Sequence, residues 1–177
     1  MPTTPNGLVY PALSDAPNGP GAVQALAESI EAKYPLGPWT AYTPALTASG
    51  TNPTLGTAAV QLGRYRESSG LVLCQGKIVF GSAGVAAGAG NYRVGLPVPA
   101  NIAAWADRRI GHATIYQVSS GNQAEPFATL DAAGGGFFTL AYLTALPASN
   151  AIPVGAAAPW AWAVGDTLWW NVAYEPA

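Results

Sequence analysis

The chain has 177 residues, a length typical of one domain or of one domain with an appendage. Half of the residues are apolar and only 9% are charged, against about 25% in an average soluble domain, and the net charge is −2. Because the seven lysines and arginines are scattered along the chain, this composition disfavours a nucleic-acid-binding protein, which needs a concentrated positive face.

Residues 1–20 are rich in proline, glycine and asparagine, and their five prolines exclude a helix. They predict an extended segment that lies over another surface. Residues 21–34 predict the one clear helix, with Pro20 at its first position, Asn18 or Gly19 as its cap, and prolines beyond its end.

The predicted helix carries an apolar seam formed by Val23, Leu26 and Ile30, at the spacings of three and four residues that coiled coils use. A helix of this length, about 21 Å, is marginal on its own in water. Two interpretations remain open: the seam associates with copies of itself, or it packs on the chain's own domain.

After residue 38 the apolar pattern changes to a period of two, and turn-forming clusters separate the segments. The predicted strands are 40–46, 58–67, 71–80, 91–96, 109–118, 126–131, 137–143 and 167–175. Short strands without a second helix predict an all-β fold, a β-sandwich or jelly roll with a short N-terminal helical stem. We therefore expect an anchor at residues 1–20, a stem at 21–36 and a β-sandwich head at 37–177.

The sequence shows no membrane or secretion signal. Its longest uncharged stretch, residues 132–165, contains glycines and prolines that exclude a single membrane-spanning helix. The N-terminal residues lack the basic and apolar regions of a signal peptide. The single cysteine, Cys74, excludes an internal disulfide and is expected to be a small buried apolar residue. We expect synthesis in the cytoplasm and no membrane insertion.

Groups that carry catalysis are few. His112 is the only histidine and lies in a predicted strand, and no G-x-S-x-G motif surrounds any serine. Most of the acidic residues lie on the predicted helix, in turns or at strand ends. These are ordinary solvent-exposed positions for acidic residues, so they give no indication of the carboxylate pair that glycoside hydrolysis requires. The glycine-rich runs lack the Lys-Ser/Thr of a phosphate-binding loop, and no calcium-loop motif is present. We expect no catalytic site, no metal and no cofactor.

Four of the six tryptophans fall between residues 160 and 170. An exposed indole can stack on a sugar ring, whereas buried ones fill a core or a subunit interface, and both interpretations stay open. In the predicted strand 167–175 the side chains alternate: one face carries Leu168, Trp170, Val172 and Tyr174, and the other carries Trp169, Asn171 and Ala173. At most one of the adjacent Trp169 and Trp170 therefore faces the core of a sheet. The candidate ligand platform is Trp160, Trp162 and Trp169.

Three motifs follow the proline-rich segment and the helix. They are W-x-x-Y-T-P at residues 39–44, G-T-x-P-x-L-G beginning with Gly50 and Thr51, and G-R-Y at residues 63–65. Over residues 7–99 this order resembles the tail-associated, fibre-like virion proteins of phages and prophages of actinobacteria.

The resemblance implies a non-enzymatic virion structural protein, such as a minor tail protein: a homotrimeric tail-tip or tail-fibre module for host attachment. In that case residues 1–20 bind other virion proteins, the stem residues Val23, Leu26 and Ile30 hold the trimer together, and the head contacts host-envelope glycan. The alternative is a capsid decoration or head-fibre protein on the phage head. A third hypothesis, from another class, is a small glycan-processing enzyme.

Overall fold

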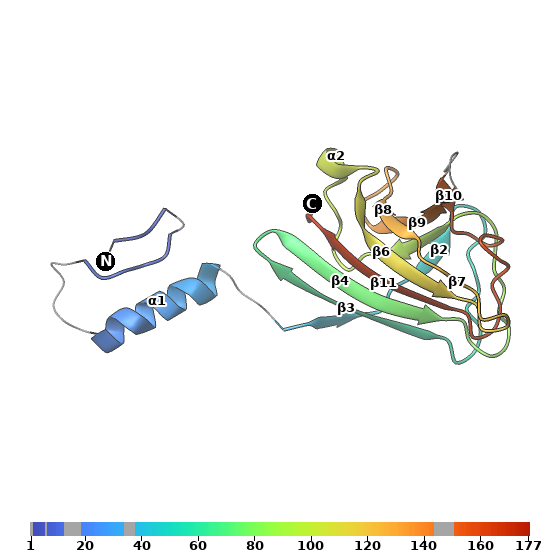
Figure 1. Cartoon of the computed structure of the whole chain (residues 1–177), viewed down its shortest axis with the longest axis horizontal. Helices are drawn as coiled ribbons and strands as arrows, with labels where there is room; N and C mark the ends of the chain where they lie inside the picture. The colour runs from blue at the N-terminus through green and yellow to red at the C-terminus, as the bar shows by residue number, and fades with distance from the viewer. Residues whose placement is uncertain (1, 6, 13–18, 34–37, 144–150) are drawn as a thin grey trace.

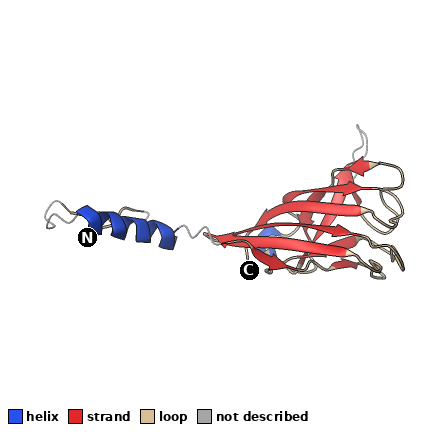
Figure 2. Ribbon diagram, turned by 90° about the horizontal axis from the view of Figure 1, so that it is seen from below, coloured by secondary structure: helices blue, strands red, loops and turns tan. Residues whose placement is uncertain are grey.

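The structure is a computed structural model that describes residues 2–5, 7–12, 19–33, 38–143 and 151–177. The predicted helix is present as α1 (Gly19–Lys33), which begins two residues earlier than expected. The proposed cap Asn18 lies outside the described residues. Figures 1 and 2 show α1 apart from the β-sheet that forms the rest of the chain.

The N-terminal residues fold back on themselves instead of running as one extended segment. Thr3 and Val9 form an antiparallel bridge, and the N–H of Tyr10 donates to the carbonyl of Pro2 at 3.0 Å. Gly7 makes the turn possible with a φ of 74°, a conformation that other residues adopt at a cost. The N–H of Val9 donates to the Ser29 hydroxyl at 3.3 Å, which ties this segment to α1.

The remaining described residues form an antiparallel sheet of eleven strands in the order β1-β3-β4-β11-β6-β8-β9-β5-β2, with β10 paired to β9 and β7 to β6. The strands are β1 (Thr40–Tyr42), β2 (Leu46–Ala48), β3 (Val60–Ser68), β4 (Leu71–Val79), β5 (Tyr92–Gly95), β6 (Arg109–Tyr116), β7 (Gln123–Ala124), β8 (Phe127–Leu130), β9 (Phe137–Leu143), β10 (Ala151–Pro153) and β11 (Thr167–Tyr174). The all-β prediction with a short N-terminal helix is confirmed. Seven of the eight predicted strands are present with ends within two residues of those expected.

The predicted strand 40–46 is in fact two strands at opposite ends of the sheet order. Pro44 lies between them, and because proline has no N–H to donate, it interrupts a strand ladder. The Pro44 carbonyl accepts from Nε2 of Gln61 at 2.8 Å, and the next carbonyl, that of Ala45, accepts from Gly95 N–H at 2.8 Å. The segment thus passes from one edge of the sheet to the other, and the sheet curls into two layers (Figure 2).

The expectation of no second helix is wrong at one place. A single turn, α2 (Ile102–Trp105), begins with Asn101, whose side chain accepts from the N–H of Ala104. The short strands β7 and β10 were also not predicted.

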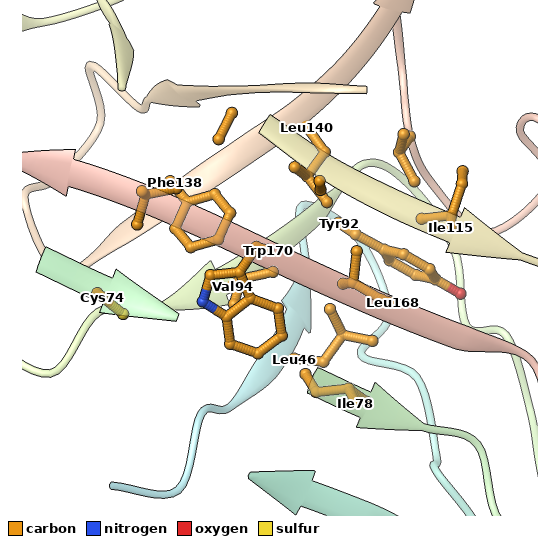
Figure 3. Close-up of a cluster of buried hydrophobic side chains, with 14 of the residues drawn as sticks. Leu46, Cys74, Ile78, Tyr92, Val94, Ile115, Phe138, Leu140, Leu168 and Trp170 are labelled. Atoms are coloured by element: carbon orange, nitrogen blue, oxygen red, sulfur yellow. The ribbon is translucent and has the colours of Figure 1, made fainter. Parts of the chain in front are cut away.

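The core lies between the two layers. Figure 3 shows side chains from both layers meeting there, among them Trp170 and Leu168 of β11, Phe138 of β9 and Tyr92 of β5. The alternation predicted for β11 is confirmed: the even-numbered residues 168–174 are buried, and the odd-numbered ones between them are exposed or half-buried.

Candidate functional site

The side of β3, β4, β11 and β6 that faces away from the core, called here the outer face, carries two rows of side chains across the strands. The strand register places Lys77 beside both Leu62 and Trp169, and places Thr114 on the other side of Trp169. The second row, two residues further along each strand, is Arg64, Gln75, Asn171 and His112. Polar, cationic and apolar groups therefore lie side by side on one face of the sheet.

A hollow of about 550 Å³ opens on this face. The side chains that line it are Leu62, Arg64, Gln75, Lys77 and Trp169, over the backbone of β3 and β4. We call it the outer-face hollow. A smaller hollow of about 150 Å³ lies on the other side of Trp169, beside His112, Thr114 and Asn171. The Trp169 side chain, which is 40% exposed, thus stands between two depressions.

The local sequence explains why Trp169 points outward. Its neighbour Trp170 enters the core, where its ring lies over Gly76 and 6.1 Å from the ring of Phe138. A Cβ on Gly76 would come within 2.4 Å of the Trp170 ring, so a residue with a side chain there would displace the indole. Because successive strand residues point to opposite faces, the buried Trp170 leaves Trp169 on the outer face.

Cations are concentrated on this face. The guanidinium groups of Arg64 and Arg66 lie 4.8 and 5.0 Å from the ring centre of Trp39. With the Gln75 amide oriented so that its oxygen faces Arg64, that oxygen accepts from Nε and Nη2 at 2.5 and 2.7 Å. Lys77 adds a third positive charge, and neither cross-strand row contains an Asp or Glu.

Of the three tryptophans predicted as a platform, only Trp169 lies on the outer face. Trp162 is 5% exposed, stacks on Phe80 with ring centres 5.2 Å apart, and donates to the Gly155 carbonyl at 3.0 Å. Trp162 therefore fills the core, which is one of the two roles left open for the tryptophans. Trp160 is half-buried and packs 6.3 Å from Trp162, so it belongs to the same cluster.

The partners of Trp169 were missed by sequence reasoning. Leu62, Arg64, Gln75 and Lys77 come from β3 and β4, between 92 and 107 residues earlier in the chain. The alternation within each predicted strand gives their face, but the register that aligns them with Trp169 depends on pairing between β4 and β11. The sequence therefore indicates which face these side chains occupy, but not that they lie beside Trp169.

The predicted stem residues are all exposed. Val23 is 67% exposed, Leu26 37% and Ile30 44%. Three large apolar side chains of one helix therefore face solvent in the structure of the single chain, and the head does not cover them.

The core contains a thiol and a phenol in contact with each other, and a buried carboxyl group. Cys74 is fully buried, as expected, and its Sγ lies 3.0 Å from the hydroxyl oxygen of Tyr42. Burial raises the pKa of both the Cys74 thiol and the Tyr42 phenol. A thiol with a raised pKa is a weak nucleophile. Asp166 is also buried and accepts backbone N–H groups from Val118 and Ala163 at 3.0 and 2.9 Å, which gives it a structural role.

Within the described residues, no group of three or more His, Cys, Asp and Glu side chains is placed to hold a metal ion. Neither helix in that part of the chain has the length and apolar run that a membrane span requires. Comparisons with protein-family models, with curated proteins and with solved structures found no match. Function is therefore inferred from the stem and from the chemistry of the outer face.

Proposed function

We propose that the chain is a non-enzymatic structural protein of a phage virion, a homotrimeric tail-tip or fibre-like module that attaches the particle to the host surface. The observation that carries the proposal is the exposed seam of Val23, Leu26 and Ile30 on a helix that stands apart from the head. The motifs at residues 39–65 connect this arrangement with virion proteins.

The energetics of α1 favour association. A helix of 15 residues is about 22 Å long and is marginal in water without tertiary contacts. Full burial of one Val, Leu or Ile side chain contributes roughly 1.5–3 kcal/mol. Because each chain brings three such side chains that its own head leaves exposed, burying them in a bundle of copies offsets part of the cost of association.

The N-terminal segment suits attachment to a larger particle. Residues 2–5 and 7–10 lie beside α1, apart from the head, and they are tied to α1 through Ser29. A partner protein of the virion can bind this segment while the head stays free to meet another surface. The alternative, a decoration or head-fibre protein on the capsid, uses the same trimer at a different site on the particle.

The stem is tested by the native mass of the full chain, measured by sedimentation or light scattering. We expect a mass of three chains of 18.0 kDa for the wild type and of one chain for Leu26→Asp, because a carboxylate in the seam cannot be buried. Gln24→Asp is the matched control: it places the same charge on an exposed position of the same helix that is turned away from the seam, and it should leave the trimer intact.

Two results would contradict the proposed stem. A wild-type mass of one chain would remove the trimer altogether. A trimer that survives Leu26→Asp would show that the head, and not the helix, holds the copies together. The place of the module on the particle is tested by immunogold electron microscopy: gold at the tail tip supports host attachment, whereas gold over the head favours decoration.

A further inference from the structure

We propose that the outer-face hollow binds an anionic saccharide, with Trp169 as the stacking platform and with Arg64 and Lys77 as the cations that pair with its acidic groups. This inference rests on the proposed function, because it names the ligand class by which the head would hold a host surface. Three features of the outer face favour such a ligand: the exposed ring, the charge and the free hydrogen-bonding groups.

The Trp169 ring is carried by a strand that is paired on both sides. Trp169 is the third residue of β11, which pairs with β4 on one side and with β6 on the other. Strands lie about 4.8 Å apart, so the row from Leu62 through Lys77 and Trp169 to Thr114 extends about 14 Å. Leu62, which is 57% exposed, adds apolar surface at the far wall of the hollow. Such a surface fits the C–H face of a sugar ring, and the indole N–H can donate a hydrogen bond.

The charge of the patch selects for an anion. Arg64, Arg66 and Lys77 are three of the seven cations of the whole chain, and they lie on two adjacent strands. Their local charge is positive although the chain as a whole carries −2. Because the two rows around the hollow contain no Asp or Glu, these cations have no carboxylate partner within them. Carboxylate or phosphate groups on a sugar would complement them.

The polar groups around Trp169 still have donors to offer. Arg64 has five N–H donors, and its contact with Gln75 uses two of them. Asn171 and His112 are exposed beside the smaller hollow and can meet sugar hydroxyls. A buried subunit interface is the competing role for this face, but interface cores are depleted in lysine, and Lys77 lies at the centre of the row.

The ligand class is tested by titration calorimetry of the purified full chain with three probes. These are an oligogalacturonate, which carries carboxylates, a phosphomannan oligosaccharide, which carries phosphate, and neutral maltohexaose. We expect one or both acidic probes to bind at least tenfold more tightly than maltohexaose, and more weakly as salt is raised. Which acidic probe binds identifies the carboxylate or the phosphate as the source. Equal binding of all three, or no binding, would overturn the proposal.

The site is tested by substitution. Trp169→Thr keeps a strand-forming residue and should weaken acidic-probe binding at least tenfold, whereas Trp169→Phe should retain part of it. Arg64→Gln and Lys77→Gln should lower the preference for acidic over neutral probes. Trp105→Thr is the matched control, because Trp105 has a similar exposure but lies outside the hollow.

Circular dichroism and native mass are measured for every variant. Equal losses in the Trp105→Thr and Trp169→Thr variants, or a change of native mass on Trp169→Thr, would overturn the site and assign the face to packing. The outcome is separable from that of the stem. If the chain is a trimer that binds none of the probes, the saccharide site is refuted and the trimeric stem is retained. If the chain is a monomer that binds the acidic probes, the trimeric stem is refuted and the saccharide site is retained.

Discussion

The contact between Gly76 and Trp170 gives a sharp test of how the head is packed. Gly76 pairs with Gly63 on one side and with Trp170 on the other, and the indole lies directly over it. A Cβ at this position would lie 2.4 Å from Cζ2 of Trp170 and 2.5 Å from the carbonyl oxygen of Leu62. The ring can tilt, but the carbonyl belongs to the backbone of β3, so Gly76→Ala forces two paired strands apart.

The size of the effect follows from these contacts. Overpacking of a core costs about 1–3 kcal/mol, and a backbone obstacle places Gly76→Ala at about 3 kcal/mol. In a chain of this length each kcal/mol lowers the Tm by roughly 2–4 °C, so we expect a fall of about 6–12 °C. The loss should exceed the gain of about 0.4–1 kcal/mol that a glycine-to-alanine change brings by restricting the unfolded chain.

Urea denaturation followed by circular dichroism measures the free energy of unfolding. Gly136→Ala is the matched control, since no atom lies within 4 Å of a Cβ built there, and we expect it to change stability by less than about 1 kcal/mol. If Gly76→Ala unfolds within about 0.5 kcal/mol of the wild type, the indole does not lie on the glycine in the way described, and the outward direction of Trp169 loses its explanation.

Two further predictions concern buried polar groups. Asp166→Ala should lower the free energy of unfolding by about 3 kcal/mol, because the N–H groups of Val118 and Ala163 lose their acceptor. Glu125→Ala, at an exposed position, is the control and should lower it by less than about 0.5 kcal/mol. Equal losses in urea denaturation would contradict the structural role of Asp166. Stability should also fall as the pH rises above about 10, because tyrosines of the unfolded chain lose protons that the folded protein retains. The slope should be about 1.4 kcal/mol per pH unit for each such tyrosine, and these tyrosines should cause no change below about pH 9. Equal urea midpoints at pH 8 and pH 11 would refute this expectation. It arises because burial raises the pKa of three tyrosines: Tyr42, Tyr92 and Tyr174.

Much of the fold could be predicted because most strands have one buried face. In β11 the alternation of large apolar and smaller or polar residues is strong enough to assign each side chain to a face, and Trp169 was placed correctly relative to Trp170. The division at Pro44 could not be read from the apolar pattern, because it depends on a carbonyl contact with Gln61 of another strand.

The candidate site could be predicted less well, for two physical reasons. Trp160 and Trp162 lie between β10 and β11 in a segment with no regular alternation, so their sequence spacing does not give their direction. The cations around Trp169 come from strands whose register with β11 is set by pairing over a long sequence distance. Sequence proximity therefore grouped Trp169 with Trp160 and Trp162, which pack against the core, and gave no indication of Arg64 and Lys77.

The position of β11 also bears on the order in which the head can assemble. This strand follows every other strand in the chain, yet it lies between β4 and β6 (Figure 1). Until Thr167–Tyr174 have left the ribosome, a nascent head holds two partial sheets, and β4 and β6 each present an unpaired row of backbone groups. Such unpaired edges can pair with other chains. Strand exchange and aggregation between neighbouring copies are therefore favoured before β11 inserts between β4 and β6.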